Sequence, residues 1–286
     1  MSTETTDTVA APGTHAPLPP LNADYAVSDE QVEQFWRDGF IVLRAVLSRD
    51  EVTAYGAAIR KTAMRRFAAR GMQASAHGAF LQTLGLRFDD DGVRRFCLAP
   101  RFGAIAARLL RVPAVRIFHE QALFKQPGGT DSHWHQDQYY WPLATDRSLG
   151  LWMPLVDCSR EMGTIRFVRG SHRYGDLAGR DISDESARHF DDFIARERLE
   201  IHQTEELAAG DCTFHLGWTV HGAPANHSGA MREAMIVTFY PDGTRVDTLS
   251  NPSRVNDARV FLGGKKAGDL ADSELNTVVY RSPRAG

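Results

Sequence analysis

The sequence predicts a mainly β protein with flanking helices, built as a sandwich or barrel. Two observations support this fold class. Helical patterns come first in the chain, and from Val115 onward short β-branched and aromatic runs recur between Gly, Pro, Asn and Asp. Several short strands at such spacing are typical of an all-β sandwich or barrel. The composition agrees, because 43% hydrophobic and 24% charged residues are ordinary for a globular chain of 286 residues.

The N-terminal part of the chain predicts a disordered tail followed by a single domain. Residues 1–24 are rich in Thr, Ala and Pro, and such a segment cannot bury enough apolar surface to offset its ordering entropy. Residues 25–286 contain no internal repeat and no low-complexity tract. They are therefore expected to fold as one domain.

Two capping boxes predict the starts of the first helices. Ser28 is followed by Gln31, and Ser48 by Glu51; at this spacing each side chain can bond a backbone N–H group of the other residue. Together with the hydrophobic spacing, these starts predict a short helix after Ser28, a strand over 39–44, and helices over 52–69 and 102–110.

The rest of the chain predicts the β body and one helical insertion. Residues 70–100 have no clear pattern, and residues 183–196 are predicted to form a helix. Turn residues separate strand-like runs at 115–125, 133–141, 149–156, 163–169, 200–204, 211–216, 219–221 and 232–240.

Charge, hydropathy and cysteine usage exclude several classes of protein. The net charge of −3 lacks the basic excess of a general nucleic-acid binder, and no run approaches the ~20 apolar residues of a membrane span. The N-terminus does not predict a secretory signal. The chain has three cysteines, Cys97, Cys158 and Cys212. Their spacing fits neither a disulfide framework nor a zinc site. We expect a cytoplasmic protein with reduced thiols, with no nucleic-acid or membrane partner. These patterns do not predict its oligomeric state.

The densest group of chemistry-bearing residues lies within 130–141. On a strand, side chains alternate between faces, so His133, His135 and Asp137 would share one face. An imidazole and a carboxylate are two ligands of the 2-His-1-carboxylate triad, which suits non-heme Fe(II) because it leaves open positions. A pattern of three residues is weak evidence by itself.

A third ligand must come from a distant strand. The candidates are His172, His189, His202, His215, His221 and His227. His221 stands out, because it lies in the segment 210–222, where a Gly-Asp turn opens a strand. Turn residues over 223–229 then predict an antiparallel hairpin that returns Arg232 to the cavity of His221. A guanidinium there can bind a carboxylate bidentately. His215 has the same strand parity and is interpreted as a packed core imidazole.

These motifs resemble the phytanoyl-CoA dioxygenase (PhyH-like) family of Fe(II)/2-oxoglutarate-dependent oxygenases. The resemblance covers about residues 28–282. It rests on the stretches 38–44, 125–128, 135–138, 151–155 and 163–172 and on the spacing from His221 to Arg232. The resemblance implies a double-stranded β-helix core, which is a jelly-roll or cupin-like fold, with helices packed outside.

The resemblance also implies the residues of the site and its cofactors, which are Fe(II), 2-oxoglutarate as cosubstrate, and O2. The implied iron ligands, and thus catalytic residues, are His135, Asp137 and His221. The implied cosubstrate contacts are Arg232 at the distal carboxylate and, more loosely, Lys125, Trp152 and Thr164. His133 is a further candidate for a cosubstrate contact, with plain pocket lining as the alternative.

The sequence departs from the family pattern at two turns. Met162 stands where the family usually has Asn, and Arg169 where it usually has Pro. Both departures concern local turns and leave the implied ligands intact. Asp137 is retained, whereas related halogenases replace this carboxylate with a small residue. Halogenation is therefore disfavoured.

The resemblance implies hydroxylation of an unactivated C–H bond in a small organic or specialised metabolite, with release of succinate and CO2. The same cofactor chemistry can instead end in desaturation, epimerisation or ring formation. Two further alternatives stay open: a metal-dependent cupin enzyme without cosubstrate, and an inactive binding protein. An acyl-CoA substrate would need basic residues near the mouth, but the basic run over 60–70 is interpreted as a solvated helix face.

Overall fold

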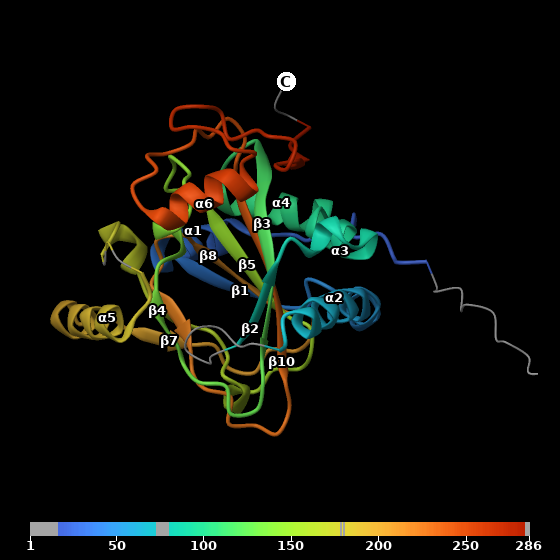
Figure 1. Cartoon of the computed structure of the whole chain (residues 1–286), viewed down its shortest axis with the longest axis horizontal. Helices are drawn as coiled ribbons and strands as arrows, with labels where there is room; N and C mark the ends of the chain where they lie inside the picture. The colour runs from blue at the N-terminus through green and yellow to red at the C-terminus, as the bar shows by residue number, and fades with distance from the viewer. Residues whose placement is uncertain (1–16, 73–79, 178, 180, 284–286) are drawn as a thin grey trace, which may run out of the picture.

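The computed structural model of the protein describes residues 17–72, 80–177, 179 and 181–283. Two antiparallel sheets form the core, and helices pack around them (Figure 1). The sheets face each other, since the ring of Phe40 in one stacks on the ring of Phe167 in the other at 4.4 Å. The predicted fold class, a jelly-roll core with flanking helices, is confirmed.

Within the described residues, the larger sheet has seven strands, and every pairing in it is antiparallel. In spatial order the strands are β1 (Phe40–Leu43), β8 (Cys212–Leu216), β5 (Leu149–Pro154), β10 (Arg232–Pro241), β3 (Ala114–Lys125) and β11 (Val278–Arg281), and β2 (Leu81–Leu84) also pairs with β3.

The smaller sheet carries the segments that approach the site. Its strands in the described chain are β4 (Ser132–His135), β9 (His221–Ala223), β6 (Arg166–Val168) and β7 (Ile201–Gln203). His135 and His221 are register partners in the pairing of β4 with β9. The antiparallel ladder thus places two imidazoles side by side, although they are far apart in sequence.

The predicted hairpin between 219–221 and 232–240 is wrong. His221 opens β9 in the smaller sheet, whereas Arg232 opens β10, which lies between β5 and β3 in the larger sheet. The connection over 224–231 therefore crosses from one sheet to the other. Turn residues mark where a chain reverses, but they do not determine which strand the next run pairs with.

The larger sheet has one face toward the helices and one toward the smaller sheet. Along β10, Met235 and Phe239 belong to the core that contains the helices, whereas Ala234 and Ile236 pack inside with residues of both sheets. This is the two-residue alternation of a strand. The covering helices are α1 (Asp29–Asp38), α2 (Arg49–Ala69), α3 (Asp91–Cys97) and α4 (Pro100–Leu110).

Both predicted capping boxes are present. The Ser28 hydroxyl accepts from the Gln31 N–H at the start of α1, and the Ser48 hydroxyl accepts from the Glu51 N–H at the start of α2. In each box the second side chain bonds back to the backbone N–H of the serine. Helix α2 therefore begins at Arg49, three residues before the predicted start.

The predicted strand over 133–141 is too long. Strand β4 ends at His135, and a 3-10 turn, η2 (Asp137–Tyr139), follows. The side-chain amide of Gln136 donates to the carbonyls of Gly175 and Trp218, both at 2.7 Å. These bonds draw the chain out of the sheet. Asp137 consequently does not lie on a strand.

Several elements lie in segments where the sequence pattern predicts neither a helix nor a strand. Strand β2, the 3-10 turn η1 (Leu86–Phe88) and α3 lie within 70–100, and residues 73–79 of that segment are outside the described residues. Helix α6 (Pro252–Phe261) and strand β11 follow the last predicted strand. The predicted insertion is α5 (Asp184–Glu197), which packs on β4 through Phe190, Phe193 and Trp134.

Part of the segment predicted as a tail, residues 17–24, lies within the described residues. Residues 1–16 lie outside the described residues, and the side chains of Arg95 and Arg101 donate to the Leu18 and Ala23 carbonyls. Leu21 is buried, and the Tyr55 hydroxyl donates to the Pro19 carbonyl at 2.6 Å. Contacts of this segment with the helices therefore begin before Tyr25.

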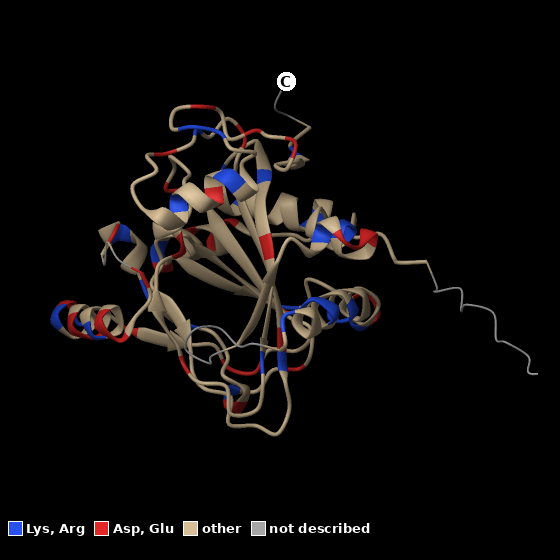
Figure 2. Ribbon diagram, in the orientation of Figure 1, with Lys and Arg blue, Asp and Glu red and all other residues tan. Residues whose placement is uncertain are grey.

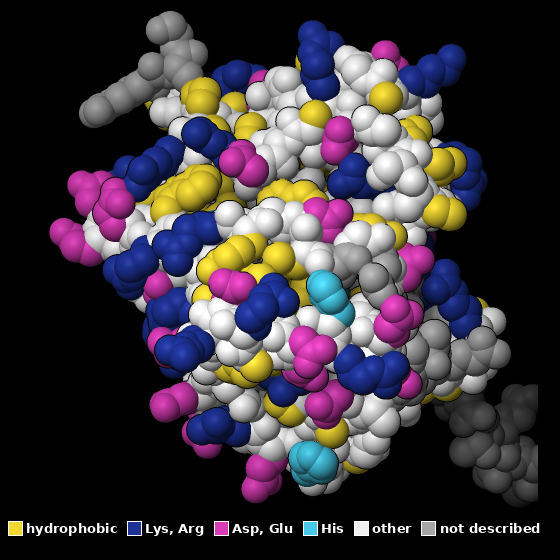
Figure 3. Space-filling view, turned by 90° about the vertical axis from the view of Figure 1, so that its left-hand side faces the viewer, with side chains coloured by type: hydrophobic (Ala, Val, Ile, Leu, Met, Phe, Trp, Pro, Cys, Tyr) yellow, Lys and Arg dark blue, Asp and Glu magenta, His cyan; other side chains and the backbone are white. Residues whose placement is uncertain are grey.

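The outer surface has mixed charge. Figure 3 shows the side that carries α5, where acidic and basic side chains are interspersed. Among the described helices, none combines the length and apolar character required to span a bilayer.

Candidate metal centre

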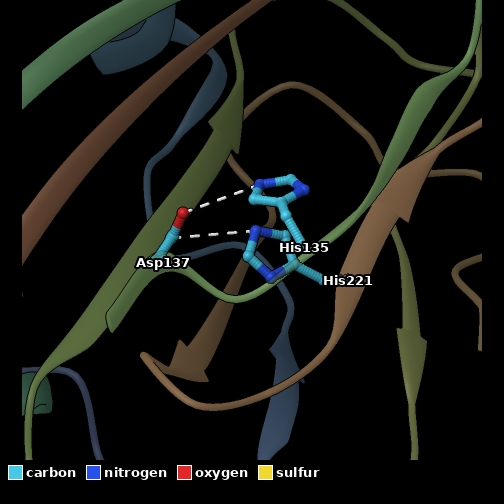
Figure 4. A group of neighbouring side chains, drawn as sticks. All are labelled: His135, Asp137 and His221. Atoms are coloured by element: carbon cyan, nitrogen blue, oxygen red, sulfur yellow. Dashed lines mark ion pairs between the residues drawn. The ribbon is translucent and has the colours of Figure 1, made fainter. Parts of the chain in front are cut away.

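Three side chains that the sequence singles out converge between the two sheets. They come from the end of β4 (His135), the start of η2 (Asp137) and the start of β9 (His221), and their ligand atoms all lie within 4.8 Å of one another. Asp137 Oδ1 is 3.6 Å from His135 Nε2, and Asp137 Oδ2 is 3.7 Å from His221 Nε2 (Figure 4). Two nitrogens and one carboxylate at these separations fit a single Fe(II) ion.

Backbone carbonyls orient both imidazoles. His135 Nδ1 lies 2.8 Å from the His133 carbonyl, and His221 Nδ1 lies 2.9 Å from the Thr219 carbonyl. A carbonyl only accepts, so each Nδ1 carries the proton and donates. This leaves both Nε2 lone pairs directed at Asp137 and free for a metal, the arrangement usual for histidine ligands.

Burial sets the protonation of these groups. It lowers the pKa of His135 to about 4 and that of His221 to about 4. Burial would raise the pKa of Asp137, but His221, His215 and His135 beside it hold that pKa well below its usual range. The cluster is thus two neutral imidazoles and one carboxylate near neutral pH, as metal binding requires.

Acidification is expected to destabilise the metal-free protein from about pH 6.5 downward. Histidines in the unfolded chain have a pKa near 6.5, whereas folded His119, His135 and His221 have a pKa of about 4. Between these values the unfolded chain binds more protons, so the free energy of unfolding decreases as the pH falls.

Urea unfolding at about pH 7.5 and pH 5 measures this dependence, because ordinary carboxylates scarcely titrate in that interval. His135→Asn should reduce the difference in the free energy of unfolding between the two pH values. His227→Asn, at an exposed position, should leave it unchanged. An unchanged difference in His135→Asn would contradict the assigned neutral imidazole.

His215 also belongs to the site, although the sequence favoured a plain core role. Its Nε2 lies 3.3 Å from Asp137 Oδ2, and its ring is 4.4 Å from that of His221. The side chain is buried, and a Cβ atom at Gly150 would lie 3.0 Å from the ring. Glycine at that position makes room for the imidazole. Strand parity with His221 could not have found it, because His215 lies on β8 of the larger sheet and His221 on β9 of the smaller one.

Arg232 is a buried cation that lacks a carboxylate partner among the described residues. Its guanidinium donates from Nη1 to the Gly163 carbonyl at 2.6 Å and lies over the Trp152 ring at 5.6 Å, while Nε has no partner. Burial lowers the pKa of Arg232 to about 10, so it stays charged. A buried, under-satisfied guanidinium fits the carboxylate of a ligand such as 2-oxoglutarate.

The turn before β6 is shaped for this contact. Gly163 has φ +78°, and a Cβ there would lie 2.2 Å from the Pro224 carbonyl oxygen, so only glycine fits. Met162, the departure from the family pattern, buries its side chain in the core between the sheets. The substitution thus leaves the carbonyl that Arg232 contacts in place.

Lys125 is buried, and its ammonium contacts the loops that flank the site. The Nζ atom lies within hydrogen-bond distance of Thr130 O (2.9 Å), Ser132 Oγ (3.2 Å), Ala223 O (3.4 Å) and Pro224 O (2.8 Å). An ammonium has three donors, so these acceptors occupy all of them. Burial, assisted by nearby Arg232, lowers the pKa of Lys125 to about 7. Its role as a cosubstrate contact stays a prediction.

Trp152 lies beside Arg232, and Thr164 follows Gly163, whose carbonyl accepts from Arg232. Trp152 packs in the core between the sheets, and the Thr164 hydroxyl donates to the Thr204 carbonyl at 2.6 Å. The indole can therefore form an apolar wall next to the guanidinium, whereas the Thr164 hydroxyl is already engaged. Their contact with cosubstrate stays a prediction.

The His133 ring lies away from the triad. Its Nε2 is 3.2 Å from Asp184 Oδ1 in the first turn of α5, and the β4–β9 pairing shifts register between Ser132 and His135. The expected common face of His133, His135 and Asp137 is thus broken by this shift and by the end of the strand. A direct cosubstrate contact by His133 stays a prediction.

The other candidate histidines make contacts elsewhere. His172 Nε2 lies 3.0 Å from the Trp36 carbonyl, His189 Nε2 lies 2.7 Å from the Leu177 carbonyl, and His202 stacks on Phe40 at 5.1 Å. His227 is exposed in the loop between the sheets.

Known proteins similar to this chain include phytanoyl-CoA dioxygenases. The family described as phytanoyl-CoA dioxygenase (PhyH) matches residues 35–234. Phytanoyl-CoA dioxygenase 1 from Oryza sativa subsp. japonica is 31% identical over 138 residues, which cover 47% of this chain and 49% of the relative. The chain thus spans about half the length of the curated relatives it matches first.

Two solved structures have the same fold. The non-heme α-ketoglutarate-dependent carbocyclase SnoK from nogalamycin biosynthesis superposes with a TM-score of 0.73 at 24% identity, over 88% of this chain and 96% of that one. The epimerase SnoN, in complex with Fe3+, α-ketoglutarate and nogalamycin RO, superposes with a TM-score of 0.73 at 23% identity, over 88% of this chain and 98% of that one. Both likenesses extend well beyond the segments that hold the three ligands.

Proposed function

Because the chain belongs to the phytanoyl-CoA dioxygenase (PhyH) family, we propose that it is a non-heme Fe(II)/2-oxoglutarate-dependent oxygenase. One observation carries the proposal. A His-Asp-His cluster with preset imidazoles lies in the same interior as a buried guanidinium that lacks a carboxylate partner among the described residues. A metal triad alone fits many enzymes, but the added anion site fits a keto-acid cosubstrate.

Each residue has a defined task in this proposal. His135 and His221 would hold the iron through their Nε2 lone pairs and Asp137 through one oxygen, a ligand set that leaves room for further ligands. Arg232 binds the distal carboxylate of 2-oxoglutarate, and Trp152 lines the space beside it. When bound, Fe(II) and 2-oxoglutarate supply an O2-dependent oxidation that releases succinate and CO2 and removes hydrogen from a C–H bond.

The surrounding chain keeps the site dry and its donors aligned. Phe167 packs against the rings of His215 and His221 at 5.4 and 6.3 Å. Asp137 accepts from His215 through Oδ2, which leaves Oδ1 for a metal. Contacts of this kind fix the tautomer and the orientation of metal-binding side chains.

We propose hydroxylation of a small organic molecule, such as a specialised metabolite, as the reaction. The SnoN complex supports a small-molecule substrate, because that neighbour holds nogalamycin RO. Retention of Asp137 disfavours halogenation. Desaturation, epimerisation and ring formation are the alternative outcomes, and the two neighbours, a carbocyclase and an epimerase, are examples of two of them.

The basic run on α2 supports a substrate other than a CoA ester. Lys and Arg residues lie along this helix (Figure 2), but Arg60 pairs with Glu233 at 2.6 Å, and Arg66 pairs with Asp89 at 2.6 Å. These guanidiniums are already neutralised. They would have to give up their partners to bind the phosphates of a CoA ester.

An anaerobic titration tests the proposal. Metal-free protein is loaded with Fe(II) and then with 2-oxoglutarate while the visible spectrum is recorded. A metal-to-ligand charge-transfer band that saturates near one equivalent is the expected result. Iron binding without the band would favour a metal-dependent cupin enzyme that uses no cosubstrate. Absence of both would favour a binding protein that has kept the fold.

A further inference from the structure

We propose that Arg254 is a positioning residue for the metal-binding turn, and that the C-terminal helix α6 thereby completes the metal centre. This inference rests on the proposed function, because it assigns a role toward the proposed iron site. Arg254 lies beyond residues 35–234, the segment that the family matches. The site would thus depend on a part of the chain outside the family match.

The contacts of Arg254 are directed at the residues that follow Asp137. The residue is 8% exposed. Nε donates to the Tyr139 carbonyl at 3.0 Å, and Nη2 donates to the Gln138 carbonyl at 3.1 Å. One planar guanidinium therefore holds two consecutive carbonyls of the turn η2, a geometry that an ammonium does not reproduce.

The other donors of Arg254 fix it to its own segment. Nη1 donates to Asp247 Oδ2 at 2.8 Å and to the Thr248 carbonyl at 3.2 Å. Asn251, the N-cap of α6, accepts from the Arg254 N–H at 2.8 Å and donates from Nδ2 to the Tyr139 carbonyl at 3.3 Å. The start of α6 and the turn are thus connected through two side chains.

The turn needs such support because it is not part of a sheet. Strand β4 ends at His135, so no ladder of backbone bonds fixes Asp137. On the opposite side, the Gln138 N–H donates to the Gly217 carbonyl at 2.9 Å and its side-chain amide donates to the Leu143 carbonyl at 3.0 Å. The turn is held between the end of β8 and α6, and loss of Arg254 would remove two of the three side-chain bonds described from the start of α6 to the turn.

Helix α6 has its own packing, which separates positioning from folding. Phe261 and Leu262 are buried with residues of β3 and β10, including Phe118 and Tyr240. The Phe118 and Phe261 rings lie 5.7 Å apart. This apolar cluster should keep α6 in place when the guanidinium is removed.

The test compares Arg254→Met with Arg254→Lys and with a matched control, Arg259→Met. Arg259 lies on the same helix but is exposed, and its guanidinium donates to the side chain of its neighbour Asn256. Three quantities are measured: amide hydrogen exchange of residues 136–141 in metal-free protein, Co(II) affinity with its visible spectrum, and thermal unfolding. Co(II) serves as a spectroscopic probe of the iron site.

Arg254→Met is expected to exchange faster over 136–141 and to bind Co(II) about 10- to 100-fold more weakly, with an altered spectrum. Arg254→Lys should recover part of the exchange protection and part of the Co(II) affinity. Arg259→Met should behave as the unsubstituted protein. If Arg254→Met lowers only the unfolding temperature while exchange, affinity and spectrum stay unchanged, Arg254 is merely structural and the proposal is overturned.

Two milder variants cover the case in which Arg254→Met does not fold. Asp247→Asn removes the charge that holds Nη1, and Asn251→Ser keeps a helix cap but removes the donor to Tyr139. Both should shift exchange and Co(II) affinity in the same direction, and unchanged values in both would overturn the proposal. If the unsubstituted protein binds no metal, the proposed function fails, while metal-free exchange still decides the Arg254 contact.

Discussion

Asp137→Ala is expected to abolish Fe(II) binding and with it the charge-transfer band and any 2-oxoglutarate-dependent turnover. Asp137 is the carboxylate of the His-Asp-His cluster, with one oxygen facing each ligand imidazole. Its removal leaves two neutral nitrogens, which bind Fe(II) weakly without a charged partner. The loss should exceed the ~10- to 100-fold that substitution of an outer contact causes.

The measurement is Fe(II) or Co(II) affinity under anaerobic conditions, together with succinate formation. Asp137→Asn keeps the shape and removes the charge, so it separates packing from ligation. Asp192→Ala, at an exposed position on α5, is the matched control and should bind as the unsubstituted protein does. Metal affinity or turnover unaffected by Asp137→Ala would refute the assigned triad.

Arg232→Met is expected to weaken 2-oxoglutarate binding while Fe(II) binding persists. The guanidinium is buried, and its Nε lacks a protein partner. Loss of one member of a buried, hydrogen-bonded charge pair costs about 2–5 kcal/mol, which corresponds to a roughly 30- to several-thousand-fold increase in Kd. Arg232→Lys should recover little, because an ammonium does not bind a carboxylate bidentately.

Titration of the charge-transfer band with 2-oxoglutarate gives the dissociation constant directly for each variant. Arg160→Met is the control, since Arg160 is exposed and lies 3.4 Å from the Gln203 side chain. An unchanged 2-oxoglutarate affinity in Arg232→Met would remove the cosubstrate assignment and leave the metal site standing. A parallel loss of iron would point instead to a collapsed interior.

Local patterns in the chain predict most of the scaffold. The two capping boxes are visible because a cap and its partner lie three residues apart. The run over 232–240 is visible because its β-branched and aromatic residues follow a stretch of turn residues. Composition and strand spacing predict the fold class in the same way. For the site, the H-x-D pattern and the family resemblance single out His135, Asp137, His221 and Arg232 from the sequence alone.

The remainder depends on contacts between segments that lie far apart in the chain. Asp137 leaves the predicted strand because Gln136 bonds residues 39 and 82 positions away, and Arg232 enters from the larger sheet rather than from a hairpin. The Lys125 ammonium donates to loop carbonyls, and His215 lies within hydrogen-bond distance of the Asp137 carboxylate. Arg254 of α6 donates to the turn that follows Asp137.

The nature of sequence periodicity explains why some features could be predicted from the chain and others could not. A period of two or 3.6 residues is a property of neighbouring residues, so it shows which side of an element is apolar and where an element begins. It carries no information on which strands pair, because the same alternating strand can pair with several partners. Residues whose roles follow from their own segment, such as Ser28 and Ser48, are therefore predictable from the chain, whereas His215 and Arg254 acquire theirs from the packing of the two sheets and the last helix.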